Sequence, residues 1–213
     1  MALTLTARQV MDDAPVLPVI VVAEPLNAVL LARSLVAGGI RMLEVTLRTP
    51  AALACIKVIA REVPEAVPGA GTVRNAKDAR AAVKAGARFL VSPGFSWSVS
   101  DVARELGVAY LPGVSTAGEI MQALEDGHTE MKFFPAAPAG GTAILDAWRG
   151  PFPDVTFCPT GGISLDSASA FLSLSNVGCV GGSWLVPPLA VYSGNWGEVE
   201  RQARKACSLR NHS

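Results

Sequence analysis

The sequence has few of the residues that build metal centres and disulfide frameworks. It contains two histidines and four widely separated cysteines, and no two cysteines form a CxxC pair. The spacing that metal ligands or a disulfide framework would need is therefore absent, and we expect neither a metal nor another cofactor. We interpret the cysteines as small buried hydrophobic side chains of a protein in the reducing cytoplasm. They are Cys55, Cys158, Cys179 and Cys207.

Neither sign of charge is in excess. The chain has 18 basic and 18 acidic residues, so its formal net charge is zero. A nucleic-acid-binding or polybasic membrane protein needs a basic patch, and we expect neither kind of partner. The N-terminal residues do not have the pattern of a signal peptide, and no apolar run reaches membrane-spanning length. With 213 residues, half of them hydrophobic, the chain is long enough for one large globular core.

Runs typical of strands alternate with amphipathic stretches along the whole chain. A short helix is predicted from about Thr6, where Gln9 completes a capping-box pattern. Eight strands are then predicted, at residues 16–22, 40–47, 67–71, 89–91, 108–111, 130–134, 155–158 and 177–180. Helices are predicted between and after them, at residues 25–36, 50–63, 75–85, 98–106, 116–125, 142–148, 164–172 and 196–206. No composition break divides the chain, and we expect one domain over residues 1–213.

Strands that alternate with helices pair in parallel, because each crossover needs a helix. Eight such units predict an α/β protein with a closed (β/α)8 (TIM) barrel, preceded here by an extra N-terminal helix. A doubly wound open sheet has the same alternation, and the pattern alone leaves it open. The position of the polar residues favours the barrel, in which chemistry is located at the carboxyl ends of the strands.

One lysine interrupts a predicted buried strand, Met131-Lys132-Phe133-Phe134-Pro135. Its amine must reach solvent, pair with a carboxylate, or remain desolvated. A desolvated lysine is partly neutral near pH 7 and can act as a nucleophile. Phe134 alternates with Lys132, and we expect both side chains on the same face of the strand.

Three polar side chains share one face of the second predicted strand. Glu44, Thr46 and Arg48 occupy alternate positions, so they point away from the helix-packing face and into the barrel. A glutamate in that position is costly unless it is paired or has a function. One interpretation is an internal ion pair of Glu44 with Arg48 or Lys132 that only fixes register, and the other is a catalytic carboxylate.

Small, backbone-exposing residues follow several strands. Thr160-Gly161-Gly162-Ile163-Ser164 comes after the seventh predicted strand and Gly181-Gly182-Ser183-Trp184 after the eighth. Paired glycines let backbone N–H groups approach an anion, and barrels often bind phosphate in these two loops. Because no Walker-type sequence is present, we expect a phosphorylated metabolite rather than a nucleoside triphosphate.

The chain resembles the class I aldolases that cleave 2-keto-3-deoxy-6-phosphogluconate (KDPG) and often also 4-hydroxy-2-oxoglutarate (KHG). The motifs that carry the resemblance span nearly the whole chain in the family's order. They are the segments at residues 18–22, 43–49, 69–73, 92–94, 111–116, 132–136, 158–164 and 181–187.

The resemblance implies a barrel, usually a homotrimer, that acts on a phosphorylated keto acid in the Entner–Doudoroff branch of carbohydrate metabolism. It implies Lys132 as the Schiff-base former and Glu44 as the general acid/base. The implied substrate-binding residues hold the pyruvyl carboxylate (Arg48 and Thr72), line the pocket (Pro93, Phe134 and Thr160) and bind the phosphate (Gly161, Gly162, Gly182 and Ser183).

Some features leave other functions open. Ala23-Glu24-Pro25 stands where relatives tend to have a basic residue, so specificity for the distal end of the substrate is open. An aldolase of the same family that prefers another 2-keto-3-deoxy sugar acid, such as the 6-phosphogalactonate, fits the same motifs. A phosphate-binding barrel isomerase would use the same glycine-rich loops but would not need a buried lysine. A metal-dependent aldolase or decarboxylase would need metal ligands that the strand ends lack.

His128 follows Gly127 at a predicted helix end and is expected at the surface.

Overall fold

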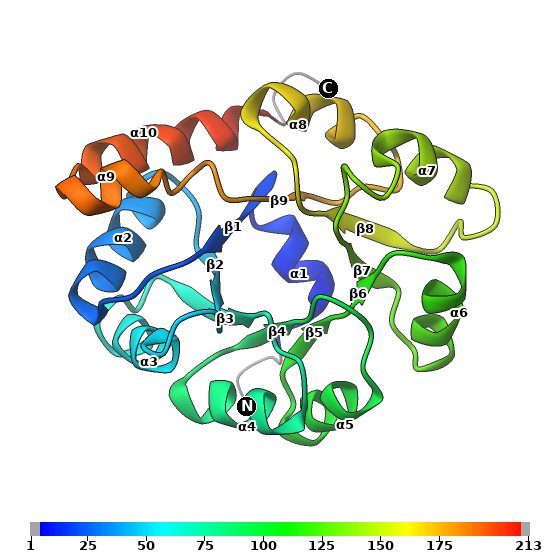
Figure 1. Ribbon diagram of the computed structural model, residues 1–213, viewed down its shortest axis with the longest axis horizontal. Coiled ribbons are helices and arrows are strands. Elements are labelled where there is room, and N and C mark those ends of the chain that lie inside the picture. Colours follow the sequence, from blue (N-terminus) through cyan, green and yellow to red (C-terminus); the bar gives the residue numbers. More distant parts are fainter. Residues whose placement is uncertain (1–4, 210–213) are drawn as a thin grey trace.

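A computed structural model describes residues 5–209, in which parallel strands alternate with helices (Figure 1). The strands are β1 (Val16–Ile20), β2 (Met42–Thr46), β3 (Val67–Gly71), β4 (Phe89–Val91), β5 (Ala109–Leu111), β6 (Gly113–Val114), β7 (Glu130–Phe133), β8 (Thr156–Pro159) and β9 (Val180–Gly182). The helices are α1 (Ala7–Asp12), α2 (Pro25–Ala37), α3 (Ala52–Glu62), α4 (Ala76–Ala85), α5 (Trp97–Leu106), α6 (Ala117–Glu125), α7 (Gly141–Trp148), α8 (Leu165–Leu172), α9 (Pro188–Ser193) and α10 (Trp196–Cys207).

The strands form two parallel sheets. One has the order β5-β4-β3-β2-β1-β9 and the other the order β6-β7-β8. The two sheets approach each other at two places. Only Pro112 separates β5 from β6, and two isolated parallel bridges, Phe157↔Val177 and Thr160↔Gly181, connect the chain around β8 with the chain around β9. Figure 1 shows the strands in the middle of the molecule, with α2 to α8 and α10 around them. The predicted α/β class with parallel strands is confirmed.

Local sequence signals account for several helix ends. Thr6 Oγ1 accepts a hydrogen bond from the backbone N–H of Gln9, and the Gln9 side chain accepts one from the backbone N–H of Thr6, so the predicted capping box is present. Asn75 caps α4 in the same region where the prediction placed its start. Gly86 ends that helix in the left-handed conformation that glycine adopts at low cost.

One strand differs in position from the prediction, and two short elements were not predicted. The last strand runs from Val180 to Gly182 rather than over residues 177–180, because pairing with β1 determines its position despite the low strand propensity of glycine. The predicted fifth strand, residues 108–111, is present as β5. A further short strand, β6, follows Pro112, which has no N–H to donate to a ladder, and was not predicted. Helix α9 begins directly after Pro187 and was not predicted.

Apolar side chains form separate layers on the two sides of the strands. Val16, Ile20, Leu43 and Val45 belong to the large cluster that the surrounding helices cover. A smaller cluster on the other side contains Val10 and Met11 of α1 together with strand residues. These strand residues are Leu17, Met42, Phe89, Val91, Ala109, Leu111, Cys158 and Cys179.

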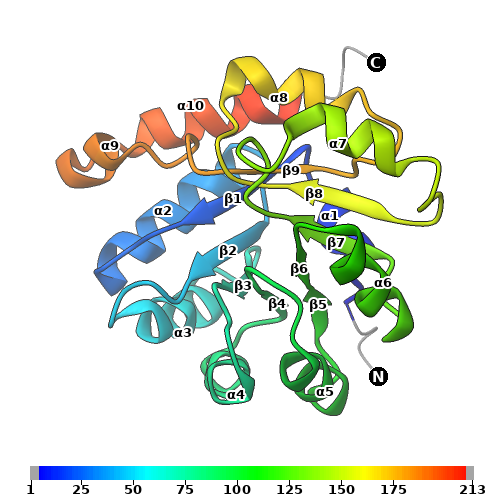
Figure 2. The same ribbon diagram turned by 45° about the vertical axis from the view of Figure 1, so that its right-hand side comes forward.

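Helix α1 lies at the amino-terminal ends of the strands. In Figure 2 the arrows of β1, β2 and β8 point away from it. The carboxyl ends of the strands, and the loops that follow them, therefore lie at the opposite end. None of the helices within residues 5–209 is long and apolar enough to cross a membrane.

Candidate active site

Lys132 is a buried lysine on β7, and its ammonium group contacts a buried carboxylate on β2. The residue is 6% exposed, and its Nζ lies 3.0 Å from Glu44 Oε1. Met131 and Phe133 are fully buried on the other side of the strand, where Phe133 packs edge-on against Trp148. The alternation along β7 thus directs Lys132 inward. The sequence left three possibilities for this amine: contact with solvent, pairing with a carboxylate, or burial without a partner. In the structure it pairs with a carboxylate.

Glu44 is 1% exposed, and only one of its two oxygens is paired. Oε1 accepts the hydrogen bond from Lys132, whereas Oε2 has no partner among residues 5–209. A buried carboxylate oxygen without a partner is costly, so an ion pair that served only to fix register is expected to satisfy both oxygens. Gly71 leaves room for this carboxylate, because a Cβ at position 71 would overlap Glu44 Oε1.

A cavity of about 170 Å³ lies over this ion pair. We call it the lysine cavity. Its lining comes from the carboxyl ends of strands and from the loops after them. The lining residues are Val19, Glu44, Thr46, Arg48, Thr72, Pro93, Lys132, Phe134 and Thr160. All seven of the predicted catalytic, carboxylate-binding and pocket-lining residues are therefore in one place.

Arg48 enters the lysine cavity from the loop after β2. Its Nε donates a hydrogen bond to Thr46 Oγ1 at 3.2 Å, and that hydroxyl in turn donates to the carbonyl of Ile20 at 2.8 Å. No salt bridge of Arg48 occurs within residues 5–209, so the guanidinium is available to an anionic ligand. The predicted common face of Glu44, Thr46 and Arg48 is confirmed, and the pair that Glu44 forms is with Lys132.

Thr72 and Phe134 contribute further features of the lysine cavity. Thr72 has φ of 58°, and it is the one non-glycine residue with a positive φ in the part of the chain that the structure describes. Backbone strain of this kind is concentrated at binding and catalytic sites. The Phe134 ring centroid lies 5.5 Å from Lys132 Nζ, within the range of a cation–π contact. The predicted common face of Lys132 and Phe134 is confirmed.

The loop that carries Pro93 is held by a buried hydroxyl group. Ser92 Oγ lies 2.7 Å from the carbonyl oxygen of Gly94 and 2.7 Å from the Tyr110 hydroxyl. Burial raises the pKa of Tyr110 to about 12, so this phenol keeps its proton at neutral pH. Gly113 packs directly on the backbone of Pro93, where a side chain would not fit.

A second cavity, of about 150 Å³, adjoins the first and shares Val19, Arg48, Phe134 and Thr160 with it. We call it the glycine cavity, because its remaining lining is Gly161, Gly162, Ile163, Gly181 and Ser183. The glycines at 161 and 162 have φ of 101° and 76°. No backbone hydrogen bond from their N–H groups is found within residues 5–209, which leaves these donors open to an anion.

The glycine at 182 differs from the other predicted phosphate-binding residues. It does not belong to the lining of either cavity, and a Cβ there would overlap the ring of Trp184. Val19, Ile163 and Gly181 line the site but were not predicted as binding residues. Period-two alternation from Leu17 along β1 would have placed Val19 on the inner face.

His128 is mostly buried, with a side chain that is 18% exposed, rather than on the open surface that the sequence predicted. Its Nε2 lies 2.8 Å from the buried Ser100 Oγ and 3.2 Å from Asp126 Oδ2. Burial lowers the pKa of His128, and Asp126 offsets part of that effect. Because one ring nitrogen faces both partners, the trio lacks the relay of a hydrolytic triad, in which the carboxylate holds the other nitrogen. No cluster of three potential metal ligands occurs in residues 5–209.

Comparison with known proteins gives a consistent result. A family model described as "KDPG and KHG aldolase" matches residues 7–202. A 2-dehydro-3-deoxy-phosphogluconate aldolase of Pseudoalteromonas atlantica is 49% identical over 94% of each chain. A KHG/KDPG aldolase of Escherichia coli is 46% identical, also over 94% of each chain.

Solved structures agree with these relatives. A KDPG aldolase of Legionella pneumophila, with pyruvate captured as a covalent carbinolamine intermediate, is 41% identical and has a TM-score of 0.94, over 97% of this chain and 100% of the other. A KDPG aldolase of Zymomonas mobilis, solved with 3-phosphoglycerate, is 43% identical and has a TM-score of 0.89, over 95% of each chain.

Proposed function

The chain belongs to the KDPG and KHG aldolase family, and we propose that it is a class I aldolase that reversibly cleaves KDPG to pyruvate and glyceraldehyde 3-phosphate. We propose that it also cleaves KHG to pyruvate and glyoxylate, as the name of the Escherichia coli relative suggests. The observation that carries the proposal is the Lys132–Glu44 pair, buried at 3.0 Å beside the lysine cavity.

In this mechanism Lys132 forms the covalent intermediate. Glu44, 3.0 Å from Nζ, is within reach to accept the ammonium proton, which leaves a neutral amine as nucleophile. The amine adds to the C2 ketone of the substrate to give a carbinolamine. Glu44 then returns its proton to the carbinolamine hydroxyl, which leaves as water, so that an iminium ion forms and Glu44 is again a carboxylate. The carbinolamine captured in the Legionella pneumophila relative is the first of these intermediates, formed there with pyruvate.

Cleavage follows because the iminium ion withdraws electrons from the neighbouring carbon. Glu44 takes the proton of the C4 hydroxyl, directly or through a water, and its unpaired Oε2 is a suitable acceptor. The C3–C4 bond breaks, the aldehyde leaves, and the electron pair remains as an enamine on Lys132. Protonation at C3 and addition of water release pyruvate and restore the amine. These steps require no metal ion.

The substrate is oriented by groups at its two ends. Arg48 and Thr72 hold the pyruvyl carboxylate in the lysine cavity, where the planar guanidinium suits a carboxylate. Pro93, Phe134 and Thr160 line the path between the ends. Ser183 and the backbone of Gly161 and Gly162 bind the phosphate in the glycine cavity, and Gly182 keeps the adjoining loop close.

We further propose that the two sheets form one closed (β/α)8 barrel with α1 as an additional N-terminal helix, in a single domain over residues 1–213. The isolated bridges between the segments of β8 and β9, and the single residue between β5 and β6, support closure. From the family resemblance we propose a homotrimer located in the cytoplasm.

Steady-state kinetics test the proposed function. Pyruvate release, coupled to lactate dehydrogenase, is measured with KDPG, with its C4 epimer and with KHG, in buffer that contains a chelator. We expect the highest kcat/KM for KDPG and full activity in chelator. A preference for the epimer would assign the chain to another sugar acid of the same family. Activity that is lost in chelator and returns only with a divalent ion would favour a metal-dependent aldolase or decarboxylase. Consumption of substrate without release of pyruvate would favour an isomerase.

A further inference from the structure

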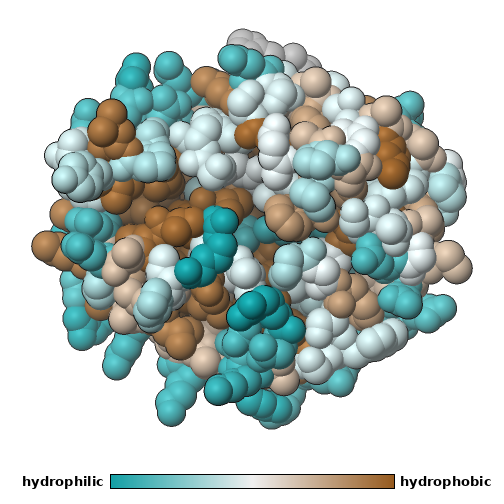
Figure 3. Space-filling view, viewed as in Figure 1, coloured by the Kyte–Doolittle hydropathy of each residue, from teal (hydrophilic) through white to brown (hydrophobic). Residues whose placement is uncertain are grey.

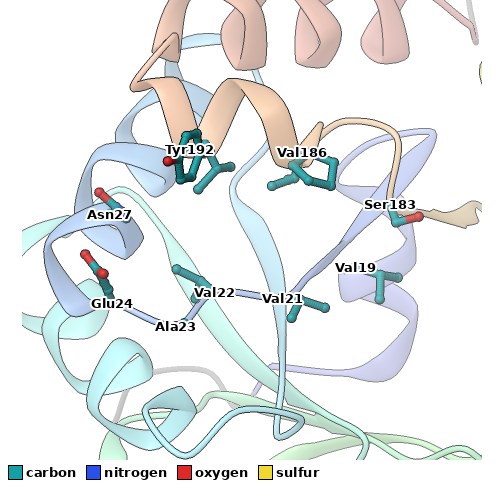
Figure 4. Close-up of a pocket in the computed structure, with 11 residues that line it drawn as sticks. Val19, Val21, Val22, Ala23, Glu24, Asn27, Ser183, Val186 and Tyr192 are labelled. Atoms are coloured by element: carbon teal, nitrogen blue, oxygen red, sulfur yellow. The ribbon is translucent and has the colours of Figure 1, made fainter.

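A third cavity, of about 430 Å³, opens beside the active site and is larger than either the lysine cavity or the glycine cavity. It lies between the end of β1, the first turn of α2 and helix α9 (Figure 4). We call it the apolar cavity, because most of its lining is aliphatic. These aliphatic residues are Val19, Val21, Val22, Ala23, Val186, Pro188 and Val191.

The apolar cavity adjoins the active site. Val19 lines all three cavities, and Ser183 lines both the apolar cavity and the glycine cavity. Figure 4 shows these two residues at one end of the apolar cavity, with Glu24 and Asn27 at the other. A ligand whose reacting end is at Lys132 therefore has the apolar cavity as its neighbour on the other side of Val19.

The charge of the lining argues against a second anionic group there. Glu24 is the one charged residue in it, and no lysine or arginine of residues 5–209 lines this cavity. A phosphate or carboxylate in the apolar cavity would lack a cation and would lie near a carboxylate. The lining instead suits an uncharged hydrocarbon chain, with Asn27 and Tyr192 as polar groups at the edge.

Apolar surface extends around the opening. Val21 is 47% exposed and Tyr192 is 91% exposed, although both are large hydrophobic residues of the lining. Figure 3 shows hydrophobic surface gathered on this part of the molecule, left of centre, between α9 and α3. Contact with a hydrocarbon chain would remove part of this surface from water, which is favourable.

We propose that the apolar cavity is a subsite for the chain of an apolar aldehyde, and that the enzyme adds pyruvate to such aldehydes as well as to the phosphorylated one. The proposal rests on the proposed function, because it uses the same Lys132 enamine. C3 of the enamine attacks the aldehyde carbon, and the C–C bond forms as the C=O π bond breaks. The aldehyde oxygen takes a proton from Glu44, and water then hydrolyses the iminium ion. The product is a 4-hydroxy-2-oxo acid with an alkyl chain.

A homologous series of aldehydes tests the subsite. The rate of pyruvate addition to acetaldehyde, butanal and hexanal is measured by chromatography of the hydroxy acid product. Burial of each methylene is expected to raise kcat/KM by about two- to fourfold, so hexanal, with four more methylenes, exceeds acetaldehyde by roughly 16-fold or more. A series in which kcat/KM does not rise with chain length would overturn the proposal.

Two matched variants on α9 locate the effect. Val191→Asp places a carboxylate in the lining, whereas Leu189→Asp makes the same change at a position on the same helix that is 76% exposed and outside the lining. We expect the ratio of kcat/KM for hexanal to that for acetaldehyde to fall about tenfold in the first variant and to stay unchanged in the second. Val21→Asp, at a more exposed lining position, repeats the test if Val191→Asp does not fold. Equal ratios in the lining and control variants would refute the subsite.

The failure of this inference is distinguishable from failure of the proposed function. Borohydride trapping of pyruvate on each variant reports on the Schiff base without any aldehyde. A flat aldehyde series with intact trapping overturns only the subsite, whereas loss of trapping in the unmodified protein overturns the aldolase mechanism. If the series is flat and the oligomer mass changes in Val191→Asp but not in Leu189→Asp, a second copy of the chain covers the cavity, and the proposal is wrong.

Discussion

The inner side of the strands has two halves that differ in chemistry. Where the strands begin, Leu17, Met42 and Phe89 pack with α1 in an apolar layer. Where they end, Glu44 and Lys132 form a buried ion pair beside two cavities. Strand β2 is five residues long and contributes to both halves, with Met42 in the apolar layer and Glu44 in the ion pair. A short distance along one strand therefore separates residues that stabilise the fold from residues that we assign to chemistry.

The two halves make opposite contributions to the free energy of unfolding. The apolar layer removes hydrocarbon from water and is stabilising. The ion pair must overcome the desolvation of two charges, and Glu44 Oε2 remains without a protein partner. An enzyme can retain such a costly group when the substrate supplies the missing hydrogen bond.

The largest effect is expected from removal of the amine. Lys132→Met should lower kcat by about 10⁴-fold or more, because no other group in the site can form the covalent intermediate. The same change leaves the Glu44 carboxylate buried without its partner, so the free energy of unfolding should also fall by about 3–5 kcal/mol. Urea unfolding and pyruvate release measure the two effects.

A double variant separates these two effects. Lys132→Met with Glu44→Leu replaces the pair by apolar side chains, and stability is expected to return to near or above that of the unmodified protein while activity stays absent. A double variant as unstable as the single one would contradict the view that the pair is retained for chemistry.

The next effect is expected at the carboxylate. Glu44→Gln keeps the shape but removes the base, and kcat should fall by about 10²- to 10⁴-fold. Pyruvate should still be trapped on Lys132 by borohydride, more slowly, because the amine remains. Unchanged kcat in this variant would remove Glu44 from the mechanism.

In the apolar layer the expected effect is on stability alone. Phe89→Ala deletes a fully buried ring and should lower the free energy of unfolding by about 3–5 kcal/mol. Because Phe89 lines neither the lysine cavity nor the glycine cavity, kcat/KM measured well below the unfolding temperature should stay close to that of the unmodified protein. A large loss of kcat/KM in the folded variant would show that the two halves are not separate.

The smallest effect is expected at His128, away from both halves. Burial lowers the pKa of His128 below its ordinary value of about 6.5, so the folded protein favours the neutral ring. This contribution to stability is present above pH 6.5 and is lost as the pH falls through the lower folded-state pKa. The urea midpoint should therefore drop less between pH 7.5 and pH 5 in His128→Asn than in the unmodified protein. An equal drop of the urea midpoint in both proteins would show that His128 does not cause this pH-dependent loss of stability.

Much of the site could be predicted because strand periodicity determines which side chains point inward. Period two placed Glu44, Thr46 and Arg48 on one face and Phe134 beside Lys132. It could not show that Glu44 pairs with Lys132 rather than with Arg48, because that choice depends on how distant strands meet. Val19 gave no polar signal, and its position where three cavities meet comes from packing alone.

The differences in the fold have a similar cause. The last strand lies further along the chain than predicted, because its ladder with β1 places Gly181 and Gly182 in a strand that their propensity opposes. Helix α9 begins at the second of two consecutive prolines, a pair that in the sequence is typical of a loop. The apolar cavity depends on both of these segments, and local patterns do not predict it.

Trapping with borohydride in the presence of pyruvate tests the central claim most directly. The account predicts that the protein gains the mass of one reduced pyruvyl group per chain, that peptide mapping places it on Lys132, and that Lys132→Met gains none. Absence of the adduct from the unmodified protein, or its presence on another lysine, would contradict the assignment of Lys132 as the Schiff-base former.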